Sequence, residues 1–191
     1  MPLSVYNYFG YGPSTNREPE SERNLLVSNG SDWGANSISN GGNVAGKWRT
    51  LTGGGSGEWD YLLNQRAMTN GKPRYTEKCV DENGTGGIAI GGETYSGLFI
   101  YPDDYNGTEV GVDATTDTWD KIDALGIVFL PAAGSRDCTS VYYVGSLGYY
   151  WSSSYSESYY ANNLCFTSDE VKPNDYDSRY LGKLVRLVSE N

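Results

Sequence analysis

The stretch Gly148-Tyr149-Tyr150-Trp151-Ser152-Ser153-Ser154 opens the part of the chain that decides the fold. After it, Phe166, Val171 and the alternating run Leu184-Val185-Arg186-Leu187-Val188 are spaced as fixed anchors with polar residues between them. No helical period connects these anchors, and such alternation is typical of strands. The sequence therefore predicts that residues 135–183 form a meander of short strands joined by long surface loops.

A first helix is predicted directly after the glycine-rich residues 53–57. Trp59, Leu62, Leu63 and Arg66 recur at i, i+3, i+4 and i+7, which places them on one face of a helix. The N-terminal 50 residues lack such a pattern, and we expect loops and short strands there, pinned by Trp33 and Trp48.

A second helical pattern begins at Trp119. Thr118, or Thr116 two residues earlier, can cap its first turn through a side-chain oxygen. Trp119, Ile122 and Leu125 fall on one face, and the glycine that follows can end the helix in the left-handed conformation. We expect two helices in all.

Strand patterns lie before and after the second helix. Residues 88–90 and 98–100 are short apolar runs, and Asn83-Gly84 is a typical hairpin turn. The segment Ile127-Val128-Phe129-Leu130 is continuously apolar, as a strand buried on both faces would be. We expect it to be the central strand.

Charge and hydropathy exclude two classes of partner. The 191 residues include 14 basic and 24 acidic side chains, a formal net charge of −10, and no Lys/Arg run offers a basic footprint for nucleic acid. The longest apolar stretch, residues 127–133, is far shorter than the roughly 20 residues that cross a bilayer. Residues 1–4 do not begin a secretion signal, so we expect such a signal to be absent or removed.

Histidine is absent, which removes the Ser-His-Asp and Cys-His nucleophile systems and most zinc and copper sites. Cys79, Cys138 and Cys165 are odd in number and have no CxxC spacing. We expect three thiols, while one bridge with one thiol left over stays open.

The acidic loop containing Asp103, Asp104, Asn106, Glu109 and Asp113 offers oxygen ligands suited to calcium, but its spacing is not that of an EF-hand. Acidic loops in an acidic chain are usually solvated, so we expect neither metal nor cofactor.

Other motif matches are weak. Residues 84–86 follow a turn and precede a strand, the wrong context for a dinucleotide site, and residues 53–57 lack the Lys-Ser/Thr of a P-loop. With 24 carboxylates, no glycosidase pair can be selected from the sequence. The Asn-Gly sequons at 29, 83 and 106 are explained as tight turns. We therefore expect no enzyme activity.

Tyrosine is concentrated toward the C-terminus, where residues 135–183 hold 9 of the 17 tyrosines together with 10 serines. Tyrosine offers a large contact area with few torsions to order, and serine and asparagine add adaptable hydrogen bonds, as in antibody paratopes. A passive surface paved with tyrosine is the alternative. A low-complexity linker is disfavoured because Trp151 and Phe166 require packing.

The order of these residues resembles one family along nearly the whole chain. Similar segments are Leu130-Pro131-Ala132-Ala133-Gly134, residues 148–154, Ala161, Phe166, Val171 and Arg179-x-x-Gly182-x-x-Val185-Arg186-Leu187-Val188, with residues 9–12, 32–34, 38–42, 48–52 and 58–63 upstream. They are similar to proteins of Bacteroidetes and gut phages that have a C-type lectin fold of the formylglycine-generating-enzyme type. Some of these are the variable proteins of diversity-generating retroelements.

The resemblance implies a single α+β domain over residues 1–191, a C-type lectin-like fold of two helices, small antiparallel sheets and long loops. It implies a scaffold at residues 1–134 and a variable region at 135–191. In such retroelements template adenines are copied with errors, so asparagine codons become those of tyrosine, serine and aspartate. The ligand-binding residues that it implies are Tyr142, Tyr143, Leu147, Tyr149, Tyr155, Ser156, Glu157, Ser158, Tyr159, Tyr160, Asn162, Cys165, Asp175, Tyr176, Asp177, Tyr180 and Leu181.

The chain departs in two ways from the proteins that it resembles. No cysteine pair matches the active site of the enzyme that names the fold type, so catalysis is not implied. The calcium and sugar motifs of animal C-type lectins, Glu-Pro-Asn with a later Trp-Asn-Asp, are absent, so sugar specificity is not implied.

These observations predict a non-enzymatic recognition protein. Its five tryptophans would anchor a scaffold that presents the C-terminal residues to a macromolecular ligand, either a protein or a surface glycan, on a virion or a bacterial cell surface. A fixed-specificity structural, adhesive or fimbrial subunit is the alternative, and an enzyme with a carboxylate site is a third. Whether the chain is a monomer or a homo-oligomer stays open.

Overall fold

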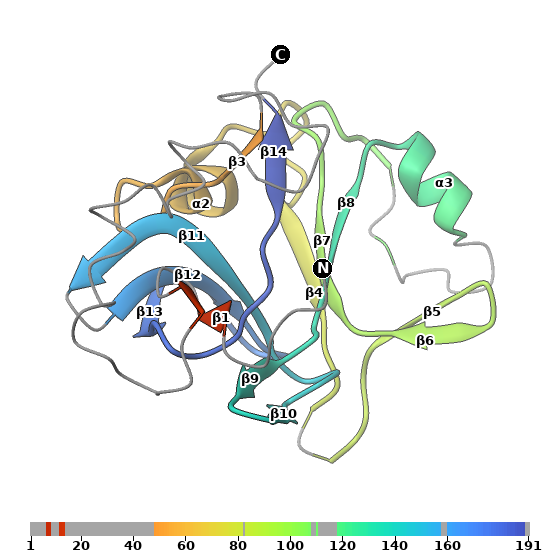
Figure 1. Ribbon diagram of the computed structural model, residues 1–191. Coiled ribbons are helices and arrows are strands. Elements are labelled where there is room, and N and C mark those ends of the chain that lie inside the picture. Colours follow the sequence, from red (N-terminus) through yellow and green to blue (C-terminus); the bar gives the residue numbers. More distant parts are fainter. Residues whose placement is uncertain are drawn as a thin grey trace.

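The computed structural model describes residues 7–8, 12–13, 48–81, 83–107, 110, 118–157 and 160–189. Within these ranges the chain forms small antiparallel sheets, two short helical segments and connecting loops, an α+β arrangement (Figure 1). The helical segments are α2 with η2 (Glu58–Asp60, Tyr61–Gln65) and α3 (Trp119–Ala124). The strands are β1 (Asn7–Tyr8), β2 (Gly12–Pro13), β3 (Trp48–Thr50), β4 (Tyr75–Lys78), β5 (Ile88–Ile90), β6 (Glu93–Tyr95), β7 (Gly97–Ile100), β8 (Val128–Pro131), β9 (Ser135–Asp137), β10 (Ser140–Tyr142), β11 (Gly148–Glu157), β12 (Tyr160–Phe166), β13 (Val171–Ser178) and β14 (Leu187–Ser189).

The first predicted helix is confirmed as a helical segment, but only its first turn is α-helical. Thr52 and Glu58 cap it reciprocally: Thr52 Oγ1 accepts from the Glu58 N–H at 2.9 Å, and Glu58 Oε2 accepts from the Thr52 N–H at 2.9 Å. The next five residues form a π-helix that ends where the Arg66 N–H donates to Tyr61 O at 2.9 Å. Trp59 of the α-helical turn and Leu63 of the π-helical turn both lie in the core, each 1% exposed.

The second predicted helix is also confirmed. Its cap is Thr118, whose Oγ1 accepts from the Lys121 N–H at 3.3 Å, and Gly126 ends it with φ +70°. Thr116, the other candidate cap, lies outside the described residues. The face prediction is wrong at one position, because Leu125 is 38% exposed while Ile122 is buried.

The prediction of the central strand is wrong. In the sheet β4–β7–β8, β7 is the middle strand and β8, which holds most of the apolar run 127–130, is an edge. Alternate residues of β7 enter two separate apolar clusters: Leu98 lies with Trp59 and Leu63, and Phe99 lies with Ile122. Because the sheet has a cluster on each face, its edge strand is as apolar as a central one.

The C-terminal region forms longer strands than predicted. β11, β12 and β13 have 10, 7 and 8 residues and lie side by side, with α2 above β11 (Figure 1). Tyr150, Leu164 and Phe166 of this sheet enter the same cluster as Trp59. Leu184 extends the sheet at the outer edge of β11, where it accepts from the Trp151 N–H at 2.9 Å.

Other local predictions have mixed outcomes. The Asn83-Gly84 turn is confirmed: the Gly84 N–H donates to Asp81 O at 3.1 Å. Short strands occur within the first 50 residues at β1, β2 and β3, but the Trp33 and Trp48 side chains lie outside the described part.

The three cysteines are confirmed as thiols with no disulfide among them. Trp151 and Trp59 are buried as anchors should be, while Trp119 is half-buried.

Candidate ligand-binding surface

The end of β10 and the two residues that follow it carry a run of exposed apolar and aromatic side chains. Val141, Tyr142, Tyr143 and Val144 are 56%, 49%, 59% and 68% exposed, and the two tyrosine rings lie 6.2 Å apart between centroids. We call these four residues the 141–144 tip. Four exposed residues of this kind in succession differ from the scattered exposed apolar side chains that need no explanation, and such concentrations mark interaction sites.

The backbone of the tip is held in an uncommon conformation. Tyr143 has φ +64°, a region that non-glycine residues adopt at a cost in strain. Its carbonyl accepts three hydrogen bonds, from the Ser146 N–H at 3.1 Å, the Leu147 N–H at 3.0 Å and Ser146 Oγ at 3.2 Å. The Tyr143 ring is therefore presented on a turn whose geometry is fixed before any ligand arrives.

Two glycines join the tip to the scaffold. Gly134 has φ +68°, and a methyl group there would overlap the carbonyl oxygen of Tyr142. The Gly145 N–H donates to Ala132 O at 2.7 Å. The tip is thus packed tightly on the segment that follows β8, where a larger residue at 134 does not fit.

A second group of predicted residues lies at the opposite end of the C-terminal sheet. Tyr160 of β12 and Tyr176 of β13 meet edge to face with centroids 5.6 Å apart, and Tyr176 is 58% exposed. Asn162 is paired with Tyr176 in the strand register, so the three side chains share one face. Asn174 ties this end to α2 through a 3.0 Å hydrogen bond from Nδ2 to Asp60 Oδ1.

A third group lies on the other face of the same sheet. Tyr149 and Cys165 are paired in the register, and Asp175 and Asp177 face the same side. Cys165 is only 8% exposed, and burial raises the pKa of its thiol to about 11. The predicted residues of these three groups therefore lie in three places. One is the tip, and the other two are the opposite faces of the sheet of β11, β12 and β13.

The remaining predicted residues occupy varied positions. Leu147, Tyr180 and Leu181 are half-buried and Ser156 is exposed. Ser158 and Tyr159, and the side chains of Tyr155 and Glu157, lie outside what the structure describes.

A buried lysine lies among the third group, and sequence reasoning did not single it out. The Lys183 side chain has no exposed surface, and its Nζ donates to Asp177 Oδ2 at 2.8 Å. Nζ also lies 4.3 Å from the ring centroid of Tyr149 and 4.6 Å from that of Trp151. Burial lowers the pKa of Lys183, and the charge and hydrogen bond of Asp177 oppose this shift.

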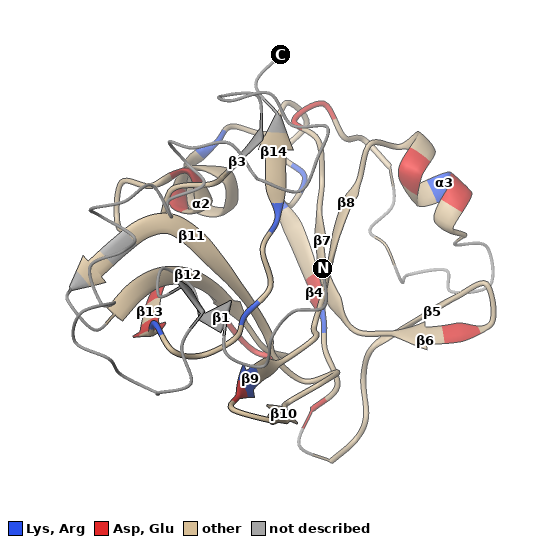
Figure 2. Ribbon diagram, viewed as in Figure 1, with Lys and Arg blue, Asp and Glu red and all other residues tan. Residues whose placement is uncertain are grey.

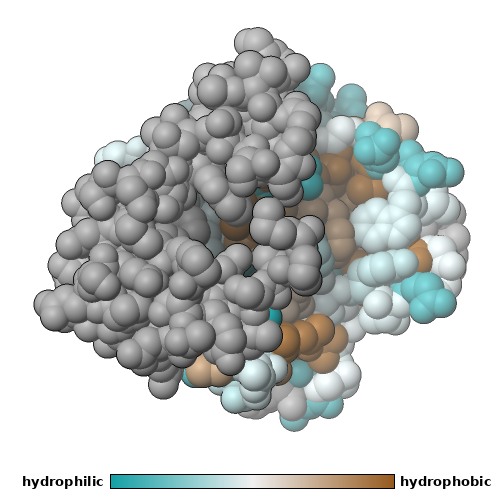
Figure 3. Space-filling model, viewed as in Figure 1, coloured by the Kyte–Doolittle hydropathy of each residue, from teal (hydrophilic) through white to brown (hydrophobic). Residues whose placement is uncertain are grey.

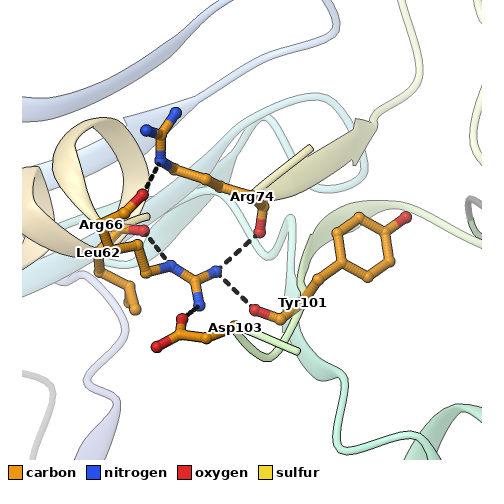
Figure 4. A network of polar contacts seen from close by, with 5 residues as sticks. All are labelled: Leu62, Arg66, Arg74, Tyr101 and Asp103. Carbon is orange, nitrogen blue, oxygen red and sulfur yellow. Dashed lines mark hydrogen bonds and ion pairs between the residues drawn. The ribbon is translucent and has the colours of Figure 1, made fainter. Parts of the chain in front are cut away.

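A second buried cation, Arg66, joins the end of η2 to β4 and β7 (Figure 4). Its guanidinium donates to the carbonyls of Leu62, Arg74 and Tyr101 at 2.6, 3.0 and 2.6 Å, and to Asp103 Oδ1 at 2.6 Å. The Arg74 Nε in turn donates to Arg66 O at 2.7 Å. These hydrogen bonds link η2 to the segments beside β4 and β7, so Arg66 holds these elements together.

An apolar cavity of about 480 Å³ opens between η2, β7, β8 and β14. Leu62, Ile100, Val128 and Leu187 line it, and Figure 3 shows apolar side chains gathered in a hollow over β7 and β8. Trp59 also lines it, and the Trp59 indole N–H has no acceptor among the described residues. The cavity has room for an apolar group.

Acidic side chains are spread over α3, β6 and the loop after β7 (Figure 2). Within the described ranges, no three Cys, Asp or Glu side chains come close enough to hold a metal ion. Asp103 and Asp104 are exposed in the acidic loop, whereas Glu109 and Asp113 lie outside these ranges.

Comparisons with protein-family models, with curated proteins and with solved structures find no match to the chain. In the part of the chain that the structure describes, no helix has the length and apolar content that spanning a bilayer requires. The chain's own residues and their geometry are therefore the basis for assigning a function.

Proposed function

We propose that the protein is a non-enzymatic recognition protein that binds a macromolecular ligand through Tyr/Ser/Asn/Asp-rich surfaces of its C-terminal region. In this proposal it has a C-type lectin-like fold, is diversified by a retroelement and acts at the surface of a virion or a bacterium. The observation that carries the proposal is the 141–144 tip, in which exposed aromatic side chains stand on a backbone that is already ordered.

Binding through such a tip follows from the energetics of association. Tyrosine rings bury a large area with only two torsions to order, and a turn fixed in advance avoids the entropy cost of ordering it in the complex. Val141 and Val144 flank the rings and add apolar area. A few such anchors account for most of the affinity in typical interfaces.

The Tyr160–Tyr176 pair supports a second contact region at the far end of the C-terminal sheet. Because the tip and this pair lie at opposite ends of the sheet, a ligand that contacts both must be large. This supports a macromolecule over a small molecule as the ligand.

Labelled protein incubated with a panel of intact gut bacterial cells tests the proposal. Tyr142→Ala combined with Tyr143→Asn, which tolerates a positive φ, is expected to reduce binding at least about tenfold, the loss of one or two hot spots. Tyr61→Ser is the matched control, because Tyr61 is also 59% exposed but lies on η2. Equal binding by both variants to every strain that the unmodified protein binds would contradict the proposal.

Deep sequencing of the gene across its population tests the diversification. Substitutions concentrated at codons 135–183, compared with codons 1–130, support a diversified binder. A uniform low rate across the gene would support the alternative, a fixed-specificity adhesive or structural subunit. That alternative expects the apolar tip to pack against a neighbouring copy, so sedimentation of the unmodified protein would show self-association that Val141→Ser removes.

A further inference from the structure

Lys183, Asn163 and Asp177 form a polar cluster on the C-terminal sheet, on the face opposite to Tyr176. We infer that Lys183 and Asn163 join in an intramolecular isopeptide bond, with Asp177 transferring the protons. The inference requires no ligand, and it gives Asp177, one of the predicted ligand-binding residues, a role in a covalent modification of the chain itself.

The geometry places an amine next to an amide carbon. The hydrogen-bonding partners of Asn163 orient its amide so that Oδ1 accepts from Lys183 Nζ at 3.2 Å and Nδ2 donates to Leu164 O at 3.3 Å. The carbonyl carbon Cγ is bonded directly to that oxygen, so the nucleophilic nitrogen and the electrophilic carbon are near neighbours. Asp177 Oδ2 lies 2.8 Å from the same Nζ.

The surroundings keep water away from the amine and the amide, whereas the Asp177 carboxylate is 35% exposed. Asn163 and the Lys183 side chain have no exposed surface, and the rings of Tyr149 and Trp151 lie against Nζ. Burial disfavours the ammonium form and lowers the pKa of Lys183, which enlarges the fraction of neutral amine at neutral pH. A neutral amine beside a carboxylate base is the usual arrangement of an activated nucleophile.

The reaction balances without an oxidant or a second reactant. Asp177 takes a proton from the Lys183 ammonium, and the neutral Nζ attacks Asn163 Cγ to form a tetrahedral intermediate. The protonated Asp177 carries a proton from Nζ to Nδ2 as the Cγ–Nδ2 bond breaks. Ammonia leaves and takes up the remaining proton as ammonium, so the products are a secondary amide, NH₄⁺ and the original Asp177 carboxylate.

The bond would close the chain between residues 163 and 183. Leu184 already lies at the outer edge of β11, where its N–H donates to Tyr149 O at 3.1 Å, and Gly182 pairs with Arg136 of β9. An amide from Lys183 to β12 would therefore fasten this edge segment across β11 to the middle strand of the sheet.

Tryptic mapping of the denatured, purified protein tests the inference. Trypsin does not cut after Lys172 because Pro173 follows, so Asn163 lies in the peptide 137–179 and an unmodified Lys183 ends the peptide 180–183. The bond is expected to block cleavage at Lys183 and to give a branched peptide of 137–179 and 180–186, lighter by one ammonia. Intact mass alone is insufficient, because Asn-Gly sequences also lose ammonia when they form succinimides.

Variants separate the chemistry from folding. Lys183→Arg, which keeps the cation, and Asp177→Asn are both expected to abolish the branched peptide while circular dichroism confirms that each variant folds. Lys172→Arg, at an exposed lysine paired with Glu170, is the matched control and should retain the branched peptide.

Each outcome decides one part of the inference. Complete cleavage at Lys183 in the unmodified protein overturns it. A branch that has lost water and maps to Asp177 overturns the choice of Asn163, and a full yield in Asp177→Asn overturns the role of Asp177.

Discussion

Replacing Arg66 by methionine removes the cation that joins η2 to the β4–β7–β8 sheet while keeping the length of the side chain. Three backbone carbonyls lose their donor, and hydrogen bonds from a charged group contribute about 1.5–3 kcal/mol each. Two of these carbonyls are only partly buried and regain water. We therefore expect the free energy of unfolding to fall by about 3–5 kcal/mol, the usual cost of breaking a buried charged network.

The ion pair itself should contribute little, which gives a matched control. Asp103 is 67% exposed against 6% for Arg66, so Asp103→Asn should cost only about 0–1 kcal/mol. Urea unfolding followed by tryptophan fluorescence measures the free energy of unfolding of both variants, and thermal unfolding measures their melting temperatures. The melting temperature should fall by roughly 6–20 °C for Arg66→Met at about 2–4 °C per kcal/mol. Equal losses in the two variants would refute the reasoning, because they would assign the stability to the ion pair.

Three further predictions concern the packing of the C-terminal sheet and the three cysteine thiols. Gly148→Ala would place a methyl group in an aromatic ring of β12 and should cost about 1–3 kcal/mol, whereas Gly55→Ala, with open space around it, should have little effect in the same urea titration. Iodoacetamide at pH 8 should alkylate Cys138 in the folded protein and all three cysteines in urea, because burial raises the pKa of Cys79 to about 12 and of Cys165 to about 11. The same raised values mean that the unfolded chain loses these thiol protons first, so stability should fall as the pH rises above about 9 and continue falling to about 12. Rapid alkylation of all three thiols in the folded protein, or flat stability over that pH range, would contradict the assignment.

Local features of the fold could be predicted from the sequence. Thr118 caps α3 and Gly126 ends it because both act through their nearest backbone neighbours, and the Asn83-Gly84 turn forms for the same reason. A short apolar run does not reveal its neighbours, so the 127–130 segment did not show that β7 would lie between it and β4. The π-helical turn at 61–65 has the same apolar spacing as an α-helix and left no separate signal.

The candidate sites show the same difference between features set by neighbouring residues and features set by distant strands. Tyrosine content predicted where aromatic residues concentrate, but not that the register of β11, β12 and β13 would place Tyr149 and Tyr176 on opposite faces. The Lys183 site needs residues from β12, from β13 and from the segment after it, and their meeting depends on strand register. One lysine among 14 basic residues carries no mark of burial in the sequence.

The pairing of β3 with β14 has a consequence for how the chain is made. Thr50 pairs with Leu187, so the two partners are separated by 187 − 50 = 137 residues. At the usual translation rate of about 5–20 residues per second, β3 waits roughly 7–27 s for its partner to be synthesised. Until then the nascent chain carries an unpaired strand edge, and we expect it to depend on chaperones during this interval more than on any step after the last strand is in place.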